Sequence, residues 1–249
     1  MTGKFYQTLR KCSHRIHQFL IELVFPRRCP VCDKIAIPYG GLICLECHDK
    51  IRYVGNLYCK KCGKKIRSAD GEICFDCKKG KHSFDRGRAI YEYTSVKESL
   101  YRFKYSGRKE YADFFGLEIS CLLKDEIRRW NPDALIPVPL HRSKVRRRGY
   151  NQAELIADVI GKHMEIPVRT DLIERCKKTV PQKELSLAAR QNNLKKAFKI
   201  CRNDVKLKTI ILIDDIFTTG STLDSMASEL KLAGVAYVYF ITLASGEGI

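Results

Sequence analysis

The sequence predicts an α/β protein in which a mainly parallel sheet is preceded by a small cysteine-rich module. The first observation is a set of cysteine pairs, each with the spacing CxxC, between Cys29 and Cys77. The second is the pattern after about Lys81, where apolar runs of strand length alternate with segments of helical periodicity. Strands joined by crossover helices form a parallel sheet that helices cover on both faces. The predicted parts are an N-terminal helix over 1–26, the cysteine-rich module over 27–80 and the α/β domain over 81–249.

Composition and charge exclude several classes of protein and favour others. The chain has 249 residues, of which 45% are hydrophobic, so it is too apolar for a disordered protein. Its 46 Lys and Arg against 28 Asp and Glu give a net charge of +18, which favours a polyanionic partner. Apolar runs such as Ile210–Ile213 are far shorter than the roughly 20 residues of a membrane span. Basic residues scattered through the first 25 positions argue against a secretory signal, so a cytoplasmic protein with reduced cysteines is expected.

The N-terminal segment has the pattern of an amphipathic helix. Its apolar residues recur at steps of four and three, which places them on one stripe, and Pro26 ends the pattern. The stripe consists of Phe5, Leu9, Cys12, Ile16, Phe19 and Leu23. We expect this stripe to pack against the rest of the chain, and the alternative is a helix that binds a partner or a membrane surface.

Four cysteine pairs form an internal repeat in the module. Each pair begins 15 residues after the previous one, and 11 residues separate successive pairs. The eight cysteines are Cys29, Cys32, Cys44, Cys47, Cys59, Cys62, Cys74 and Cys77. A CxxC pair directs two thiolates at one ion, and a second pair completes a tetrahedral site. The array therefore predicts two structural zinc ions.

The metal and the pairing leave alternatives open. A disulfide framework is typical of exported chains, and an iron–sulfur cluster also takes four thiolates. Sequential pairing joins 29/32 to 44/47 and 59/62 to 74/77 in two zinc ribbons, whereas alternating pairing would give a cross-brace. We favour sequential pairing because short loops close at the lowest entropic cost.

The α/β part alternates between strands and helices. The predicted strands are 88–93, 134–138, 197–200, 209–213 and 236–243. The predicted helices are 95–105, 111–129, 151–162 and 221–233. The β-branched run that precedes Asp214 is typical of a central strand, and ligands bind at the carboxyl ends of such strands in open α/β sheets.

The string from Ile210 to Thr222 combines a buried strand, two carboxylates, a hydroxyl-rich loop with one glycine and a helix start. The N–H groups of Thr218–Thr222 at the start of a helix, together with the loop hydroxyls, predict a cradle for a phosphate. Asp214 and Asp215 precede the loop, where they can accept hydrogen bonds from two ribose hydroxyls. The string thus predicts a site for a ribose 5-phosphate, and the alternative is a solvated strand end followed by an ordinary helix cap.

This string resembles the 5-phosphoribosyl 1-pyrophosphate (PRPP) signature of type I phosphoribosyltransferases. The resemblance implies a parallel sheet of the type I phosphoribosyltransferase kind. It also implies that Asp214 and Asp215 contact the ribose hydroxyls and are the catalytic pair if the chain is an enzyme. The residues that would hold the 5′-phosphate are Thr218, Thr219, Gly220, Ser221 and Thr222. An earlier loop, which includes Arg148, would hold pyrophosphate with Mg²⁺.

A longer resemblance covers the chain from about Cys29 to its C-terminus. The cysteine module, the strings Pro137–Leu140 and Arg148–Gln152, and the stretch Thr179–Asn193 are similar to the ComF family of competence-associated proteins. That family joins a zinc ribbon to a phosphoribosyltransferase-like domain. The resemblance implies a cytoplasmic accessory of natural transformation that handles single-stranded DNA beside a helicase-like competence protein.

Two basic segments are candidates for binding single-stranded DNA. One follows the 134–138 strand, and the other surrounds the third cysteine pair, where Tyr58 offers a stacking face. The candidate residues are Arg142, Lys144, Arg146, Arg147, Lys60, Lys61 and Lys64. The first of these segments serves either pyrophosphate or DNA. Three hypotheses result: a DNA-uptake accessory that binds PRPP or a related ribose phosphate, an active transferase with an unknown acceptor, and a structural adaptor for a helicase.

Overall fold

The computed structural model describes residues 26–66, 72–176, 197–202 and 206–246. Its contacts divide the chain into two compact units, Met1–Lys50 and Ile51–Ile249. The first contains α2 (Leu45–His48), and the second contains every other element named below. The predicted helix over residues 1–25 and the stretch Thr179–Asn193 lie outside the described residues. Among the described segments, no helix has both the length and the apolar composition of a membrane span.

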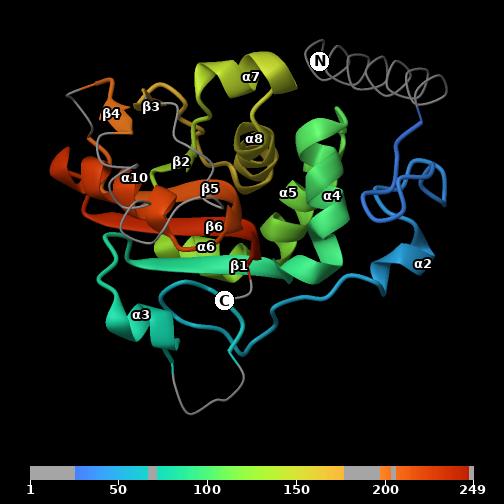
Figure 1. Cartoon of the computed structure of the whole chain (residues 1–249), viewed down its shortest axis with the longest axis horizontal. Helices are drawn as coiled ribbons and strands as arrows, with labels where there is room; N and C mark the ends of the chain where they lie inside the picture. The colour runs from blue at the N-terminus through green and yellow to red at the C-terminus, as the bar shows by residue number, and fades with distance from the viewer. Residues whose placement is uncertain (1–25, 67–71, 177–196, 203–205, 247–249) are drawn as a thin grey trace, which may run out of the picture. The chain divides into compact units, whose positions relative to one another are not determined.

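The larger unit is built on a four-stranded sheet with the order β1-β6-β5-β2 (Figure 1). The strands are β1 (Arg86–Glu92), β2 (Ala134–Pro137), β5 (Thr209–Phe217) and β6 (Tyr237–Ser245). Every neighbouring pair is parallel. The run Ile210–Ile213 at the centre of β5 is fully buried, which is the pattern of a strand covered on both faces. The predicted α/β class with a mainly parallel sheet is confirmed.

Helices cover both faces of this sheet (Figure 1). They are α4 (Tyr93–Tyr105), α5 (Tyr111–Leu122), α6 (Lys124–Trp130), α8 (Gln152–Met164) and α10 (Ser221–Leu232). Because side chains alternate along a strand, Ile210 and Leu212 share one face of β5, and both pack in a buried cluster with Met226 of α10. α8 contacts β2 and β5, while α4 contacts β1 and β6. The carboxyl end of β5 therefore lies among α4, α8 and α10.

The structure departs from the predicted elements at three places. The predicted helix 111–129 is two helices, because the backbone leaves helical geometry at Leu123 (φ −107°, ψ 14°). The basic segment predicted as a loop contains α7 (Arg142–Arg148), whose first turn is capped by a hydrogen bond from the Ser143 N–H to the His141 side chain. The predicted strand 197–200 is β4 (Phe198–Ile200), which pairs antiparallel with β3 (Ile173–Arg175) outside the main sheet.

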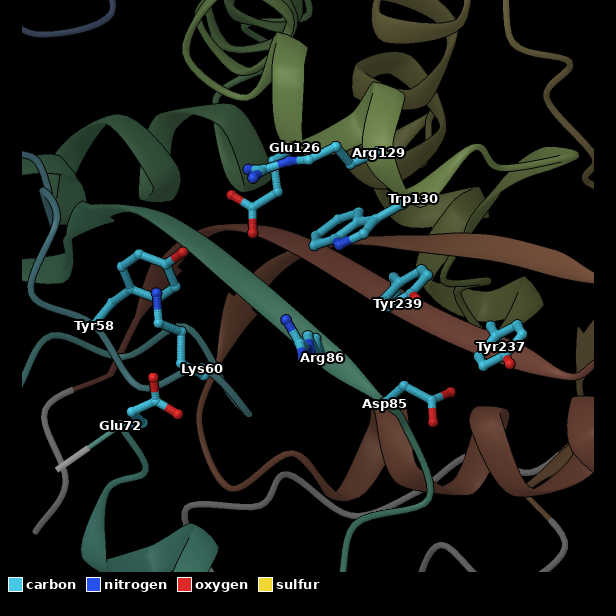
Figure 2. Close-up of a pocket in the computed structure, with 10 residues that line it drawn as sticks. All are labelled: Tyr58, Lys60, Glu72, Asp85, Arg86, Glu126, Arg129, Trp130, Tyr237 and Tyr239. Carbon is cyan, nitrogen blue, oxygen red and sulfur yellow. The ribbon is translucent and has the colours of Figure 1, made fainter.

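The second half of the cysteine-rich segment, with α3 (Phe75–Lys79), packs directly on the sheet. A Cβ at Gly63 would lie 2.5 Å from the Arg88 Cα, so only glycine allows this approach to β1. Cys59 and Cys62 are buried in the same cluster as Phe240 of β6. A cleft of about 760 Å³ opens beside this contact, at the amino-terminal ends of β1 and β6 (Figure 2).

Candidate functional site

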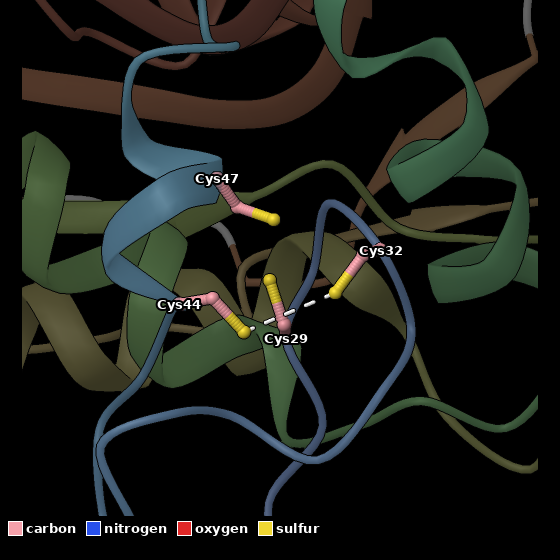
Figure 3. Close-up of side chains that lie close together, drawn as sticks. All are labelled: Cys29, Cys32, Cys44 and Cys47. Atoms are coloured by element: carbon pink, nitrogen blue, oxygen red, sulfur yellow. Dashed lines mark hydrogen bonds between the residues drawn. The ribbon is translucent and has the colours of Figure 1, made fainter.

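The paired cysteines form two separate groups of four. Figure 3 shows the first group, Cys29, Cys32, Cys44 and Cys47, whose thiols converge. The second group is Cys59, Cys62, Cys74 and Cys77, and in each group all Sγ atoms lie within 4.8 Å of one another. The Cys32–Cys44 and Cys62–Cys74 Sγ distances are 3.9 Å and 3.7 Å. A tetrahedron with Zn–S bonds of about 2.3 Å has an edge of about 3.8 Å. Sequential pairing is therefore confirmed.

The two groups repeat one backbone arrangement. In the first, the Cys29 N–H donates to the Lys34 carbonyl (2.8 Å) and the Asp33 N–H donates to the Cys29 carbonyl (2.9 Å). The corresponding bonds in the second group, 30 residues later, are both 2.8 Å. The turns require a positive φ, which is 58° at Asp33 and 71° at Gly63. The internal repeat seen in the sequence is thus a structural repeat of two ribbons.

The thiols within a group influence one another's ionisation. Hydrogen bonds from the Cys62 and Cys77 thiols hold the pKa of Cys59 well below its ordinary value. The pKa of Cys77 is raised, because its thiol donates to Cys59 and Cys62. Four clustered thiols oppose one another's ionisation, and a divalent cation would allow all four to bind as thiolates. The distances, the tetrahedral donor set and the absence of disulfides among the described cysteines fit structural zinc in both groups.

The acidic pair lies within β5 near its carboxyl end. The strand continues past the pair to Phe217, because its pairing with β6 extends to Ser245. Asp215 forms an ion pair of 2.9 Å with Lys104 of α4, and its N–H donates to the Asp214 carboxylate at 2.8 Å. Burial, and then the nearby charge of Asp215, raise the pKa of Asp214 to about 7. Asp215 is therefore paired with Lys104, while the carboxyl group of Asp214 is partly buried in surroundings that disfavour its charge.

The hydroxyl-rich turn between β5 and α10 is compact. Gly220 has φ 77° and is the residue before the first turn of α10. A Cβ there would lie 2.9 Å from the Phe217 ring, so the turn requires glycine both for its backbone and for space. The hydroxyls of Thr219 and Ser221 are 2.8 Å apart. The turn thus combines side-chain hydroxyls with the open N–H groups of a helix start, which are the donors that a phosphate binds.

Several cations surround the acidic pair. Arg175 of β3 is largely buried, which lowers its pKa, and Asp214 is the acidic group that opposes this effect. Burial lowers the pKa of Lys144, and the nearby Arg175, Arg148 and Arg147 lower it further. Arg148 donates to Gln152 (2.9 Å) and to the Tyr105 hydroxyl (3.2 Å). A hollow of about 530 Å³ lies beside this group. Its lining is Lys104, Tyr105, Gly107, Arg147 and Arg148.

The predicted nucleic-acid residues are divided between exposed and engaged side chains. On α7, Arg142, Arg146 and Arg147 are exposed, and Lys144 is partly buried. On the second ribbon, Lys60 is exposed, whereas Lys61 donates to the carbonyl of Phe84. Lys64 pairs with Asp76 at 3.1 Å, and its side chain is only 12% exposed. Lys61 and Lys64 therefore hold the ribbon in place, and Lys60 is the lysine of this set that faces solvent.

Sequence reasoning missed two cations beside the acidic pair. Lys104 and Tyr105 stand in the mixed basic and aromatic stretch 101–109, which indicated a polar surface but not its contact with Asp215. Arg175 is a single cation on a three-residue strand, and nothing in its neighbourhood in the sequence marks it. Both reach the site through tertiary contacts between distant elements.

Comparison with known proteins gives matches to both parts of the chain. Residues 20–78 match the family described as the double zinc ribbon domain. Competence protein F from Haemophilus influenzae is 38% identical over 115 residues, which are 45% of this chain and 50% of that protein. The DNA utilization protein YhgH from Shigella flexneri is 32% identical over 146 residues, which are 56% of this chain and 62% of that protein.

A third relative is Competence protein ComFC from Bacillus subtilis, which is 31% identical over 156 residues, or 61% of this chain and 60% of that protein. The chain thus spans between one half and about three fifths of these relatives. Among solved structures, a purine phosphoribosyltransferase from Pyrococcus horikoshii is 20% identical and covers 53% of this chain and 73% of its own, with a TM-score of 0.32. A score this low adds nothing to the fold, which stands on the strand order and pairing.

Proposed function

Since the chain belongs to the ComF family, we propose that it is an accessory protein of DNA uptake. In this proposal it binds PRPP or a related ribose phosphate at Asp214–Thr222, and it binds single-stranded DNA through basic surface residues beside a helicase-like competence protein. The relatives' names, competence protein and DNA utilization protein, support the DNA-related role. A competence partner of this kind acts in the cytoplasm, which is the location we propose.

The observation that carries the ligand proposal is the acidic pair at the carboxyl end of β5, followed at once by the hydroxyl-rich turn before α10. A 5′-phosphate bound in the turn would meet the hydroxyls of Thr218, Thr219, Ser221 and Thr222 and the backbone at Gly220. The ribose diol would then donate to Asp214 and Asp215. Ligand binding would break or share the ion pair between Asp215 and Lys104.

The pyrophosphate of PRPP needs a positively charged place next to the ribose. Arg148 and Lys104 line the 530 Å³ hollow, and Lys144 and Arg175 lie nearby. Burial first, and then the charges of neighbouring arginines, lower the pKa of Lys144, so an anion bound there would favour its charged form. Magnesium would arrive on the phosphate oxygens of the ligand, whose charge it neutralises.

A second candidate function is transfer of the ribose phosphate to an acceptor. The same hollow favours it, because the ring of Tyr105 is 54% exposed and offers a stacking surface for an acceptor next to Lys104, which pairs with Asp215. In this case Asp214 and Asp215 are the catalytic pair, which would stabilise positive charge on the ribose as pyrophosphate leaves. Release of pyrophosphate from PRPP in the presence of candidate nucleobases and amines distinguishes transfer from binding alone.

The ligand proposal is tested by thermal unfolding of the zinc-loaded protein. PRPP with Mg²⁺ should raise the unfolding temperature, because a ligand that binds only the folded state stabilises it. The double variant Asp214→Ala with Asp215→Ala should lose the shift, since each charged hydrogen bond contributes roughly 1.5 to 3 kcal/mol. Asp125→Ala, an exposed position on α6, is the matched control and should keep it. An equal shift in the double variant would show that the ligand binds elsewhere.

A further inference from the structure

The cleft of about 760 Å³ lies at the opposite end of the sheet from Asp214. Asp85 and Arg86 stand at the start of β1, and Tyr237 and Tyr239 at the start of β6, whereas Asp214 is near the carboxyl end of β5. Figure 2 shows the second ribbon on one side of the cleft and α6 with β6 on the other. The lining residues are Tyr58, Lys60, Glu72, Asp85, Arg86, Glu126, Arg129, Trp130, Tyr237 and Tyr239. Of this set, only Tyr58 and Lys60 belong to the basic segments considered above for DNA binding.

One wall of the cleft is aromatic. Trp130 stacks on Tyr239, with ring centroids 4.6 Å apart and planes 6° from parallel. Tyr237 is two residues earlier on the same strand and is 47% exposed. The register of the sheet pairs Arg86 with Tyr239, which places a guanidinium beside the stack. Flat rings next to cations form a surface on which nucleobases stack.

The cleft is lined by three cationic and three acidic side chains, but its acidic charge is partly neutralised by cations outside the lining. The two carboxylates at the sheet are already bound by cations: Asp85 pairs with Lys231 (2.9 Å) and Glu126 with Arg88 (3.1 Å). Lys60, Arg86 and Arg129 are exposed, and their charges act on Glu126 together with that of Arg88, so four cations share this one carboxylate. Glu72, across the cleft, is the remaining acidic group of the lining. The cleft therefore presents an excess of positive charge.

We infer that this cleft binds single-stranded DNA, with a base against the wall of Trp130, Tyr237 and Tyr239 and with phosphates at Lys60, Arg86 and Arg129. An unpaired base exposes its faces for stacking, whereas the bases of a duplex do not, so the aromatic wall selects a single strand. The inference rests on the proposed DNA binding and gives it a site that is separate from the ribose-phosphate site and from α7. Ligand binding at Asp214 and strand binding at the cleft occupy opposite ends of one sheet.

The chain carries its own reporter of this site, because Trp130 is its single tryptophan. An oligothymidylate of about 20 nucleotides, longer than the ~4–16-nucleotide footprint of single-strand modules, should quench tryptophan fluorescence by stacking. An abasic oligomer of the same length has the phosphates without the bases and should not. PRPP, which has no base and binds at the other end of the sheet, should not quench either. Quenching by the abasic oligomer or by PRPP to the same degree would overturn the inference.

Variants separate stacking from charge. Tyr237→Ala should weaken oligothymidylate binding by roughly tenfold or more, with zinc content and unfolding temperature unchanged. Arg86→Ala with Arg129→Ala should lower the slope of log affinity against log salt by about 1.4, since each phosphate contact on a single strand contributes about 0.7. The matched control, Lys124→Ala with Arg128→Ala, removes the same charge from exposed positions of α6 outside the cleft and should keep the slope.

The outcomes also separate this inference from the proposed function. If the cleft variants bind the oligomer as the wild type does, the inference is wrong and the DNA surface lies elsewhere, for instance on α7, while the proposed function stands. If free thymidine monophosphate quenches at the same concentration as the oligomer, the cleft is a site for a single nucleotide and the strand assignment is wrong. If the wild type binds no oligomer while PRPP still shifts its unfolding temperature, both DNA proposals fail and the ligand proposal survives.

Discussion

Replacing Asp214 by asparagine should make the protein more stable, and the gain should grow with pH. Asp214 has a pKa of about 7 in the folded protein against an ordinary value of 3.8, and the first cause is burial. Between these two values the folded state holds a proton that the unfolded chain has released, so the stability contributed by Asp214 falls as pH rises. Above about pH 7 the whole cost is present, and at roughly 1.4 kcal/mol for each pKa unit it reaches up to about 4 kcal/mol.

Asparagine has nearly the same shape and no charge, so it removes this cost. The free energy of unfolding should be measured with urea from about pH 5 to about pH 8, on zinc-loaded protein. The difference between Asp214→Asn and the wild type should grow from about 1.5 kcal/mol near pH 5 to about 4 kcal/mol near pH 8, at roughly 1.4 kcal/mol for each pH unit while Asp214 is protonated only in the folded state. Other titrating groups are common to both proteins and cancel in the difference. A constant difference over this range would refute the reasoning, because Asp214 would then ionise as readily in the folded protein as in the unfolded chain.

Two further variants test what raises the pKa of Asp214. Asp215→Asn removes the neighbouring charge that helps to raise the pKa of Asp214, so it should weaken the pH dependence of stability without abolishing it. Asp125→Asn changes an exposed carboxylate of α6 and serves as the control. Its difference from the wild type should not follow the same pH course.

Further predictions concern the metal groups, the turn and α7. Cys44→Ser should reduce the zinc content from two ions to one, measured by elemental analysis, and leave the unfolding temperature of the 51–249 unit unchanged in calorimetry. Cys62→Ser should instead lower the unfolding temperature of that unit. Equal effects of the two variants on this temperature would contradict the prediction. Gly220→Ala should destabilise the protein by about 1 kcal/mol or more and abolish the PRPP shift, while Gly234→Ala, whose Cβ meets nothing within 4 Å, should keep the shift. The triple change of Arg146, Arg147 and Arg148 to alanine should flatten the salt slope of DNA binding by up to about 2; an unchanged slope with a lost PRPP shift would assign α7 to the ligand.

The parts of the fold that depend on local pattern could be predicted from the sequence. The cysteine spacing predicted two groups and favoured sequential pairing, because short loops close at the lowest entropic cost, and the structure has this pairing. The β-branched run Ile210–Ile213 identified the central strand, and the acidic pair and turn follow it as expected. The helix α7 was missed because five of its seven residues are cations, and such a run has no apolar periodicity to detect.

The parts of the fold that depend on tertiary contacts could not be predicted from the sequence. The run at 197–200 was correctly a strand, but three apolar positions do not specify a partner, and β4 pairs with β3 instead of joining the sheet. The sequence places Lys61 and Lys64 among the candidate DNA-binding residues, yet their long side chains reach the Phe84 carbonyl and Asp76. Trp130 and Tyr239 are more than 100 residues apart, and only the order β1-β6-β5-β2 brings them together.

The burial of Cys59 and Cys62 in one cluster with Phe217 makes the second zinc group and the ribose-phosphate turn neighbours through the core. Phe217 precedes Thr218, and Leu223 and Met226 of α10 complete the same cluster. If the second metal stabilises this packing, then by reciprocity a ligand held in the turn also retards loss of that metal to a chelator. Loss of zinc or oxidation of the thiols would then affect ligand binding differently in the two ribbons. Loss of the metal from the second ribbon would weaken ligand binding in the turn, whereas loss of the metal from the first would leave that binding unchanged.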